Sequence, residues 1–254
     1  MSFFQIVFSP TGGTQKVTDV FTKSFCPENI RVDLADRSRD FSSFLFSPED
    51  VCVVSVPSYG GRVPAVVGSR LRQMKGNGAK VVFFVAYGNR AYDDTLAELQ
   101  DILTDSGFSC VAAAAVVAEH SIMRQFAAGR PDEQDQRELA AFAGQIRMKM
   151  ELGADTGSLS LPGSRPYREY HGVPMKPQAG KLCTQCGLCA EKCPVGAIPV
   201  ADPSKTDSRC CISCMRCVAV CSQDARRVSR MLLAAGSVKM RKVCGGRKKN
   251  EFYM

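Results

Sequence analysis

The chain has 254 residues, of which 45% are hydrophobic, and a formal net charge of +8 at pH 7. That apolar fraction excludes a disordered chain, and the length allows one large domain or one medium domain with a small companion. The longest apolar run, residues 110–118, is far too short to span a bilayer, and the first ten residues lack the features of a signal peptide. We therefore expect a cytoplasmic protein whose thirteen cysteines are reduced rather than paired in disulfides.

Short strands and helices alternate through the first part of the chain. Runs rich in Val, Ile, Phe and Ala predict strands at residues 3–8, 29–34, 51–56, 79–86 and 108–117. Helical spacing occurs between them, at residues 14–25, 64–74 and 92–106. A last helix opens with Pro131 and acidic residues, and its apolar side chains share one face. This order predicts an α/β domain over residues 1–152, with a doubly wound, five-stranded parallel sheet.

Three polar, glycine-rich loops follow predicted strands. They are SPTGGT after the first strand, PSYGGRVP after the third and YGNRAYDD after the fourth. The first loop has the glycines and hydroxyl groups that cradle a phosphate, but it lacks a lysine. It is therefore neither the ATP-type phosphate loop nor the dinucleotide fingerprint. Taken singly, each loop could equally be an ordinary turn.

Together, the three loops and their strand order resemble those of flavodoxins, in which they enclose FMN at the carboxyl ends of the strands. The resemblance implies that hydroxyl and backbone N–H groups of the first loop hold the single phosphate of FMN. These residues are Ser9, Thr11, Gly12, Gly13 and Thr14. Because no lysine compensates that phosphate, we expect the flavin to have a low reduction potential.

The same resemblance assigns residues to the flavin ring. They are Pro57, Ser58, Tyr59, Gly60, Gly61, Tyr87, Gly88, Asn89 and Arg90. Either Tyr59 or Tyr87 should stack on the ring, and Arg62 and Arg90 either stabilise a reduced flavin or only solvate a loop. His120 is a candidate proton donor, although a hydrogen bond that orders its loop is the commoner role of such a residue.

Residues 153–180 contain nine glycines or prolines, which predicts a linker that drapes over the first domain. Residues 181–224 are too few to bury a core of side chains alone. Residues 225–254 carry nine Lys or Arg and one acid, and we expect a helix that docks on the body with a solvated basic face. An arm that binds nucleic acid is the weaker alternative.

The pattern C-x2-C-x2-C-x3-C begins at residue 183 and recurs 28 residues later. This is the bacterial two-cluster ferredoxin arrangement, in which the fourth cysteine of each run ligates the other cluster. One predicted [4Fe–4S] cluster takes Cys183, Cys186, Cys189 and Cys221, and the other takes Cys211, Cys214, Cys217 and Cys193. Structural zinc is the alternative, but zinc sites typically use separated pairs of cysteines. Cys210 is expected to be a buried small hydrophobic residue or a spare thiol, and Ser222 stands where proline is usual.

The combination resembles anaerobe-type fusions of a flavodoxin domain with a small α+β ferredoxin domain, over residues 1–225. It implies an electron-transfer protein that connects FMN with two [4Fe–4S] clusters and exchanges electrons with redox protein partners. The alternative is an FMN-dependent reductase of a quinone, a nitro compound or oxygen. In that case the linker, with Tyr167, Tyr170 and His171, would roof a substrate pocket.

Overall fold

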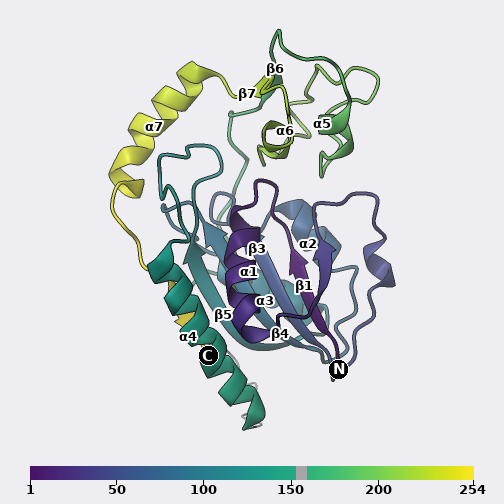
Figure 1. Ribbon diagram of the computed structural model, residues 1–254, viewed down its shortest axis with the longest axis vertical. Coiled ribbons are helices and arrows are strands. Elements are labelled where there is room, and N and C mark those ends of the chain that lie inside the picture. The colour runs from purple at the N-terminus through teal and green to yellow at the C-terminus, as the bar shows by residue number, and fades with distance from the viewer. Residues whose placement is uncertain (153–158) are drawn as a thin grey trace.

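The computed structural model describes residues 1–152 and 159–254, so residues 153–158 of the expected linker lie outside the described residues (Figure 1). Five parallel strands form the centre of the sheet, in the order β2-β1-β3-β4-β5. They are β1 (Phe3–Val7), β2 (Ile30–Asp33), β3 (Val51–Pro57), β4 (Lys80–Tyr87) and β5 (Ser109–Val117). This is the flavodoxin-like strand order, and the predicted fold class is confirmed.

Helices cover both faces of the sheet (Figure 1). One face is covered by α1 (Gly13–Phe25) and α4 (Glu133–Glu151), and the other by α2 (Ala65–Leu71) and α3 (Thr95–Asp105). A short helical turn, η1 (Phe41–Ser43), follows β2. Apolar residues recur every three or four positions in α1 and α4, so each helix buries one stripe on the sheet. Asp132 begins α4 with a capping box, as its acidic start indicates.

The cysteine-rich part lies over the carboxyl ends of the strands (Figure 1). It contains two one-turn helices, α5 (Leu188–Glu191) and α6 (Arg216–Ala219), and two short antiparallel strands, β6 (Gln178–Ala179) and β7 (Arg226–Arg227). Its apolar interior is small, and cysteines make up part of it. This agrees with the expectation that side chains alone do not fill this unit.

The C-terminal segment returns to the sheet. The helix α7 (Arg230–Cys244) packs through Leu233 and Met240 against a cluster that includes Met123 and Met175, and its Lys and Arg side chains are exposed. The strand β8 (Glu251–Tyr253) then pairs antiparallel with β5. The sheet therefore has six strands rather than the predicted five, because the tail supplies an edge strand. No helix among the described residues combines the length and apolarity needed to cross a bilayer.

Asn89 fastens this tail to the loop after β4. Its amide nitrogen donates to the backbone oxygens of Cys244 at 2.7 Å and Gly246 at 2.6 Å, and its amide oxygen accepts from the Lys248 N–H. Asn89 is 3% exposed, so its own side-chain amide would stay buried without a hydrogen-bond partner if the tail moved away. Asn89 also has a φ of 64°, a region that asparagine and aspartate tolerate best among non-glycine residues.

We expect Asn89→Asp to loosen the tail, because the substitution keeps the shape and the backbone preference but places a carboxylate oxygen against two carbonyls. The cost of unpaired buried groups predicts a loss of about 2 kcal/mol, or roughly 30-fold faster hydrogen exchange in β8. Gln125→Ala is the control, because Gln125 also contacts α7, through Ser237 Oγ, but is exposed. Equal exchange rates in wild type and Asn89→Asp would contradict this role.

Candidate functional site

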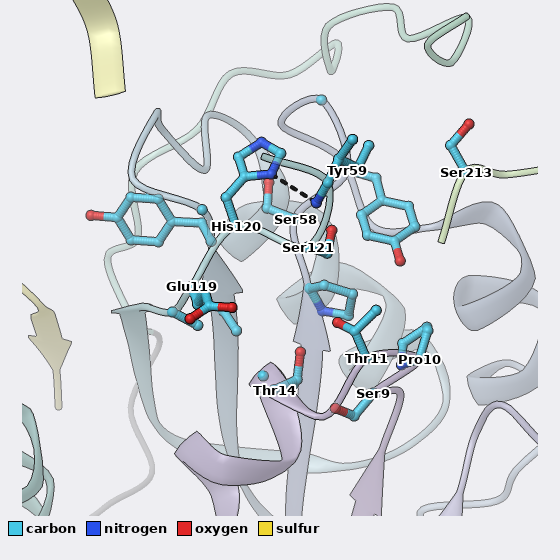
Figure 2. A pocket seen from close by; sticks show the side chains of 18 of the residues that line it. Ser9, Pro10, Thr11, Thr14, Ser58, Tyr59, Glu119, His120, Ser121 and Ser213 are labelled. Atoms are coloured by element: carbon cyan, nitrogen blue, oxygen red, sulfur yellow. Dashed lines mark hydrogen bonds between the residues drawn. The ribbon is translucent and has the colours of Figure 1, made fainter. Parts of the chain in front are cut away.

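A cavity lies where the loops after β1, β3, β4 and β5 meet the cysteine-rich part (Figure 2). Ten of the fourteen residues assigned to FMN from the sequence line it. They are Ser9, Thr11, Gly13, Thr14, Pro57, Ser58, Tyr59, Gly60, Tyr87 and Gly88. The carboxyl edge of the sheet thus brings together predicted residues that are up to 79 positions apart in the chain (Ser9 and Gly88). This is the position where ligands bind in open α/β sheets.

One end of the cavity is suited to an anion. Ser9, Thr11 and Thr14 gather there beside the start of α1 (Figure 2). Ser9 Oγ accepts the Gln15 N–H at 2.9 Å, whereas the hydroxyls of Thr11 and Thr14 have no partner among the described residues. The first N–H groups of a helix also lack partners within the helix. Free hydroxyls and a helix N-terminus together form a donor set for one phosphate.

The other end of the cavity is aromatic. Tyr59 and Tyr170 both line it, and Tyr170 packs so closely over Gly60 that a Cβ there would lie 2.1 Å from its ring. Burial raises the pKa of the Tyr59 hydroxyl well above its usual value, and Cys214, Tyr170 and Cys211 add smaller electrostatic contributions. A flat ligand could therefore stack against Tyr59 under a cover that the linker supplies.

Four predicted FMN residues lie outside this cavity. Gly12 begins α1 with a φ of 89°, and Gly61 packs against Asp93. Asn89 holds the C-terminal tail, and Arg90 is ion-paired with Asp93. The sequence places Asn89 and Arg90 in the third loop, but only the structure reveals that Asn89 contacts the distant tail and that Arg90 contacts Asp93 of the same loop.

The second predicted stacking residue, Tyr87, is oriented by the tail. Its hydroxyl donates to the Lys249 carbonyl at 3.2 Å, and its ring lies edge-on to Tyr92. Arg62 forms a two-bond ion pair with Glu98 at 2.7 and 2.8 Å, so it stabilises the loop after β3 rather than the cavity. Among the described residues that line the cavity, none is a lysine or arginine.

His120 orders its own loop. Its Nδ1 accepts the N–H groups of Ile122 at 3.1 Å and Met123 at 3.2 Å, which leaves the proton of the neutral ring on Nε2. Burial lowers the pKa of His120, so the ring stays neutral at pH 7. Because His120 also lines the cavity, both roles expected from the sequence are compatible with its position.

The eight predicted cluster ligands surround two separate cavities. The outer cavity is lined by Cys183, Cys186, Cys189 and Cys221. The inner cavity is lined by Cys193, Cys211, Cys214 and Cys217. In each cavity the fourth cysteine comes from the other run, as the crossed arrangement requires. Cys210 is exposed and lines neither cavity.

The cavity at the carboxyl edge of the sheet is called the flavin-type cavity below, because it contains ten of the residues assigned to FMN. The inner cavity adjoins its aromatic end, whereas the outer cavity faces solvent. Ile212 and Ser213 line the flavin-type cavity and lie between Cys211 and Cys214 in the chain. Cys186 of the outer set is exposed. Burial raises the pKa of Cys214 and Cys217 to about 12 each, so these thiols are protonated unless a metal displaces the proton.

Arginines fasten the cysteine-rich part to the sheet domain. Arg70 of α2 donates to the Pro194 carbonyl at 2.7 Å, beside Cys193. Arg216 of α6 reaches back to the Ser9 carbonyl at 3.5 Å and to the Asp33 carboxylate at 3.3 Å. Its Nε is buried and has no partner among the described residues, and Arg216 lines the inner cavity. This unpaired donor beside four thiols suits an anionic metal–sulfur cluster.

Comparison with known proteins supports the assignment of the cysteine-rich part. Residues 181–198 match the family model of the 4Fe-4S binding domain. No curated protein matches the chain.

Solved structures that are similar to part of this chain include two flavodoxins and an oxidoreductase. The flavodoxin of Streptococcus pneumoniae TIGR4 is 19% identical, covers 58% of this chain and 99% of its own, and has a TM-score of 0.42. A flavodoxin from the domain Archaea is 10% identical, with coverages of 59% and 99% and a TM-score of 0.41. Rubredoxin oxygen:oxidoreductase from Desulfovibrio gigas is 17% identical, with coverages of 60% and 37% and a TM-score of 0.43.

Proposed function

We propose that this chain is an electron-transfer protein that connects one FMN with two [4Fe–4S] clusters, and that the inner cluster lies between the flavin and the outer cluster. When bound, FMN would exchange one or two electrons and each cluster one. The chain would therefore convert between one-electron and two-electron partners. The observation that carries the proposal is the shared wall of the two sites, because Ile212 and Ser213 border the flavin-type cavity and are flanked by cysteines of the inner set.

The residues present fit FMN. Thr11 and Thr14 offer unpaired hydroxyls for the phosphate, and α1 adds backbone N–H groups. Tyr59 offers an aromatic face at the opposite end of the same cavity. A dinucleotide would need a second phosphate site, and the loop lacks the dinucleotide fingerprint, which favours FMN over FAD.

The residues present also fit two iron–sulfur clusters. Each cavity is surrounded by four thiols rather than by a mixed set of ligands. Backbone N–H groups of Ala197 and Ala225 donate to Cys193 and Cys221, each at 3.3 Å, and such bonds stabilise thiolate ligands. Among the described residues, no three His, Cys, Asp or Glu side chains are grouped so as to hold a single metal ion.

Docking of the two parts through Arg70 and Arg216 supports transfer within one chain. We expect electrons to redistribute between flavin and clusters at a rate that does not depend on protein concentration, because the chain itself fixes the donor beside the acceptor. Stopped-flow reduction of the fully loaded protein at several dilutions, with flavin and cluster absorption followed separately, measures this rate.

A mixture of flavin-free protein and cluster-free protein provides the intermolecular reference, whose rate must fall with dilution. If the fully loaded protein behaves like that mixture, transfer occurs between molecules and the relay is wrong. The same dilution series contains an internal check, because the final distribution of electrons must be equal at every concentration.

A second candidate function is reduction of a small acceptor at the flavin. A groove on the far side of Tyr59 and Tyr170 continues to Pro64 and Arg209, and these two tyrosines line both the groove and the flavin-type cavity. Of the linker residues expected to roof the site, Tyr170 lines both the cavity and the groove, and His171 lines the groove with an exposed side chain. The Tyr167 hydroxyl instead donates to the Asp101 carboxylate. Sustained turnover of a quinone or a nitro compound would favour this enzyme over the carrier.

A further inference from the structure

The two halves of the cysteine-rich part correspond residue by residue at an offset of 28, but one buried position differs sharply. The segment CPVGAI (193–198) corresponds to CSQDAR (221–226), so Ile198 and Arg226 occupy equivalent positions. Both are buried, with exposed fractions of 3% and 1%. Ile198 lines the inner cavity and Arg226 lines the outer cavity. The residue before each makes the same bond, because the Ala197 and Ala225 N–H groups donate to Cys193 and Cys221 Sγ at 3.3 Å.

Arg226 lies directly against a cysteine of the outer set. Its Nε donates to Cys189 Sγ at 3.2 Å. Its remaining nitrogens donate to the Thr206 hydroxyl at 2.7 Å and to the carbonyls of Pro203 and Lys205. None of these partners is a carboxylate, so the residues that the structure describes give this guanidinium hydrogen bonds but no carboxylate counter-charge.

An arginine buried without a counter-charge is costly unless an anion lies beside it. A [4Fe–4S] cluster held by four thiolates carries a net negative charge, which increases by one when the cluster accepts one electron. A fixed positive charge and an N–H donor at a ligand sulfur both stabilise the more negative state. At the inner cavity the corresponding place is filled by Ile198, and Arg216 on that side shares its charge with Asp33.

We propose that Arg226 raises the reduction potential of the outer cluster, relative to the same site with isoleucine. The one-electron equilibrium between the inner and outer clusters is thereby shifted toward the outer cluster, at the solvent-facing end. This inference rests on the proposed ligation of two clusters, but it does not require transfer from FMN. Arg226 acts through Cys189 and is a positioning and tuning residue rather than a catalytic one.

The test is a potentiometric titration of the reconstituted holoprotein, followed by EPR of the reduced clusters. Arg226→Ile recreates the first-half side chain, and Arg226→Gln removes the charge but keeps an amide that can donate. In both variants, we expect the reduction constant of one cluster to fall at least tenfold, or 59 mV for one electron, and that of the other cluster to fall by a clearly smaller factor. Arg226→Lys keeps the charge and should change the reduction constant of the same cluster less than threefold.

Arg227→Gln is the matched control, since Arg227 is the neighbour in β7, carries the same charge and is exposed. It should leave both potentials unchanged. The proposal is overturned if both clusters shift by the same factor, if neither shifts, or if Arg226→Lys shifts as far as Arg226→Ile. It is also overturned if Arg226→Ile and Arg226→Gln both lose the outer cluster and Arg226→Lys keeps it, because the charge would then be needed for cluster assembly. The titration can be made on flavin-free protein, so failure of the relay and failure of this inference are distinguishable.

Discussion

Replacing Cys193 by alanine should remove the inner cluster and leave the outer one. Cys193 belongs to the first cysteine run, but its side chain lines the inner cavity together with three cysteines of the second run. Cys193 is 8% exposed and its sulfur accepts the Ala197 N–H, so this cysteine is a buried part of the inner site. We therefore expect iron to fall from about eight to about four per chain after anaerobic reconstitution.

The EPR signal that persists identifies which cluster is lost. In Cys193→Ala, the remaining signal should still respond to Arg226→Ile, because Arg226 contacts the outer set. Cys210→Ala is the matched control and should retain about eight irons, since Cys210 is exposed and lines neither cavity. Selective loss of the outer cluster in Cys193→Ala would show that each run ligates its own cluster, contrary to the crossed assignment.

The central fold could be predicted from the sequence because local signals agree with the global arrangement. The apolar runs that become β3 and β4 are continuous, as strands buried on both faces require, and Asp132 marks the start of α4. The sixth strand could not be predicted in this way. Residues 251–253 are too few to show periodicity, and their strand conformation depends on pairing with β5, more than 130 residues earlier.

The residues of the candidate site also divide into those that the sequence predicts and those that only the structure reveals. Loops that follow parallel strands must meet at one edge, so the positions of Thr11, Ser58 and Gly88 in the cavity follow from strand order alone. The contributions of Tyr170 and Ser213 depend on how the linker and the cysteine-rich part dock, for which the sequence contains no local signal. Asn89 is the opposite case, because its loop was predicted but its side chain serves the tail.

The cysteine repeat is also informative at positions other than its cysteines. Alignment of the two halves predicts the crossed ligation, and it places Ile198 opposite Arg226. A charged residue at a position that is apolar in its counterpart would ordinarily indicate a surface site. Only the structure shows that Arg226 is 1% exposed and bonded to Cys189, which changes its interpretation from solvation to tuning of a cluster.

Removing the hydroxyls of Thr11 and Thr14 should weaken FMN binding through the phosphate alone. Both side chains line the anion-suited end of the cavity, and neither hydroxyl has a partner among the residues described. Thr→Val keeps the branched shape and deletes the donor, so each substitution should cost about 1.5–3 kcal/mol, the range for a hydrogen bond to a charged group. That corresponds to a roughly 10- to 150-fold higher Kd for FMN, measured by fluorescence titration of flavin-free protein.

Two comparisons make this result specific to the phosphate. Riboflavin has the same ring system but no phosphate, so its affinity should be equal in wild type, Thr11→Val and Thr14→Val. Thr18→Val is the control variant, because Thr18 lies one turn further along α1 and its hydroxyl donates to the Thr14 carbonyl at 2.8 Å instead of lining the cavity. If riboflavin and FMN lose affinity in equal proportion, the two threonines support the ring or the fold. The phosphate would then lie elsewhere, and the loop after β1 would no longer explain how a phosphate is held without a lysine.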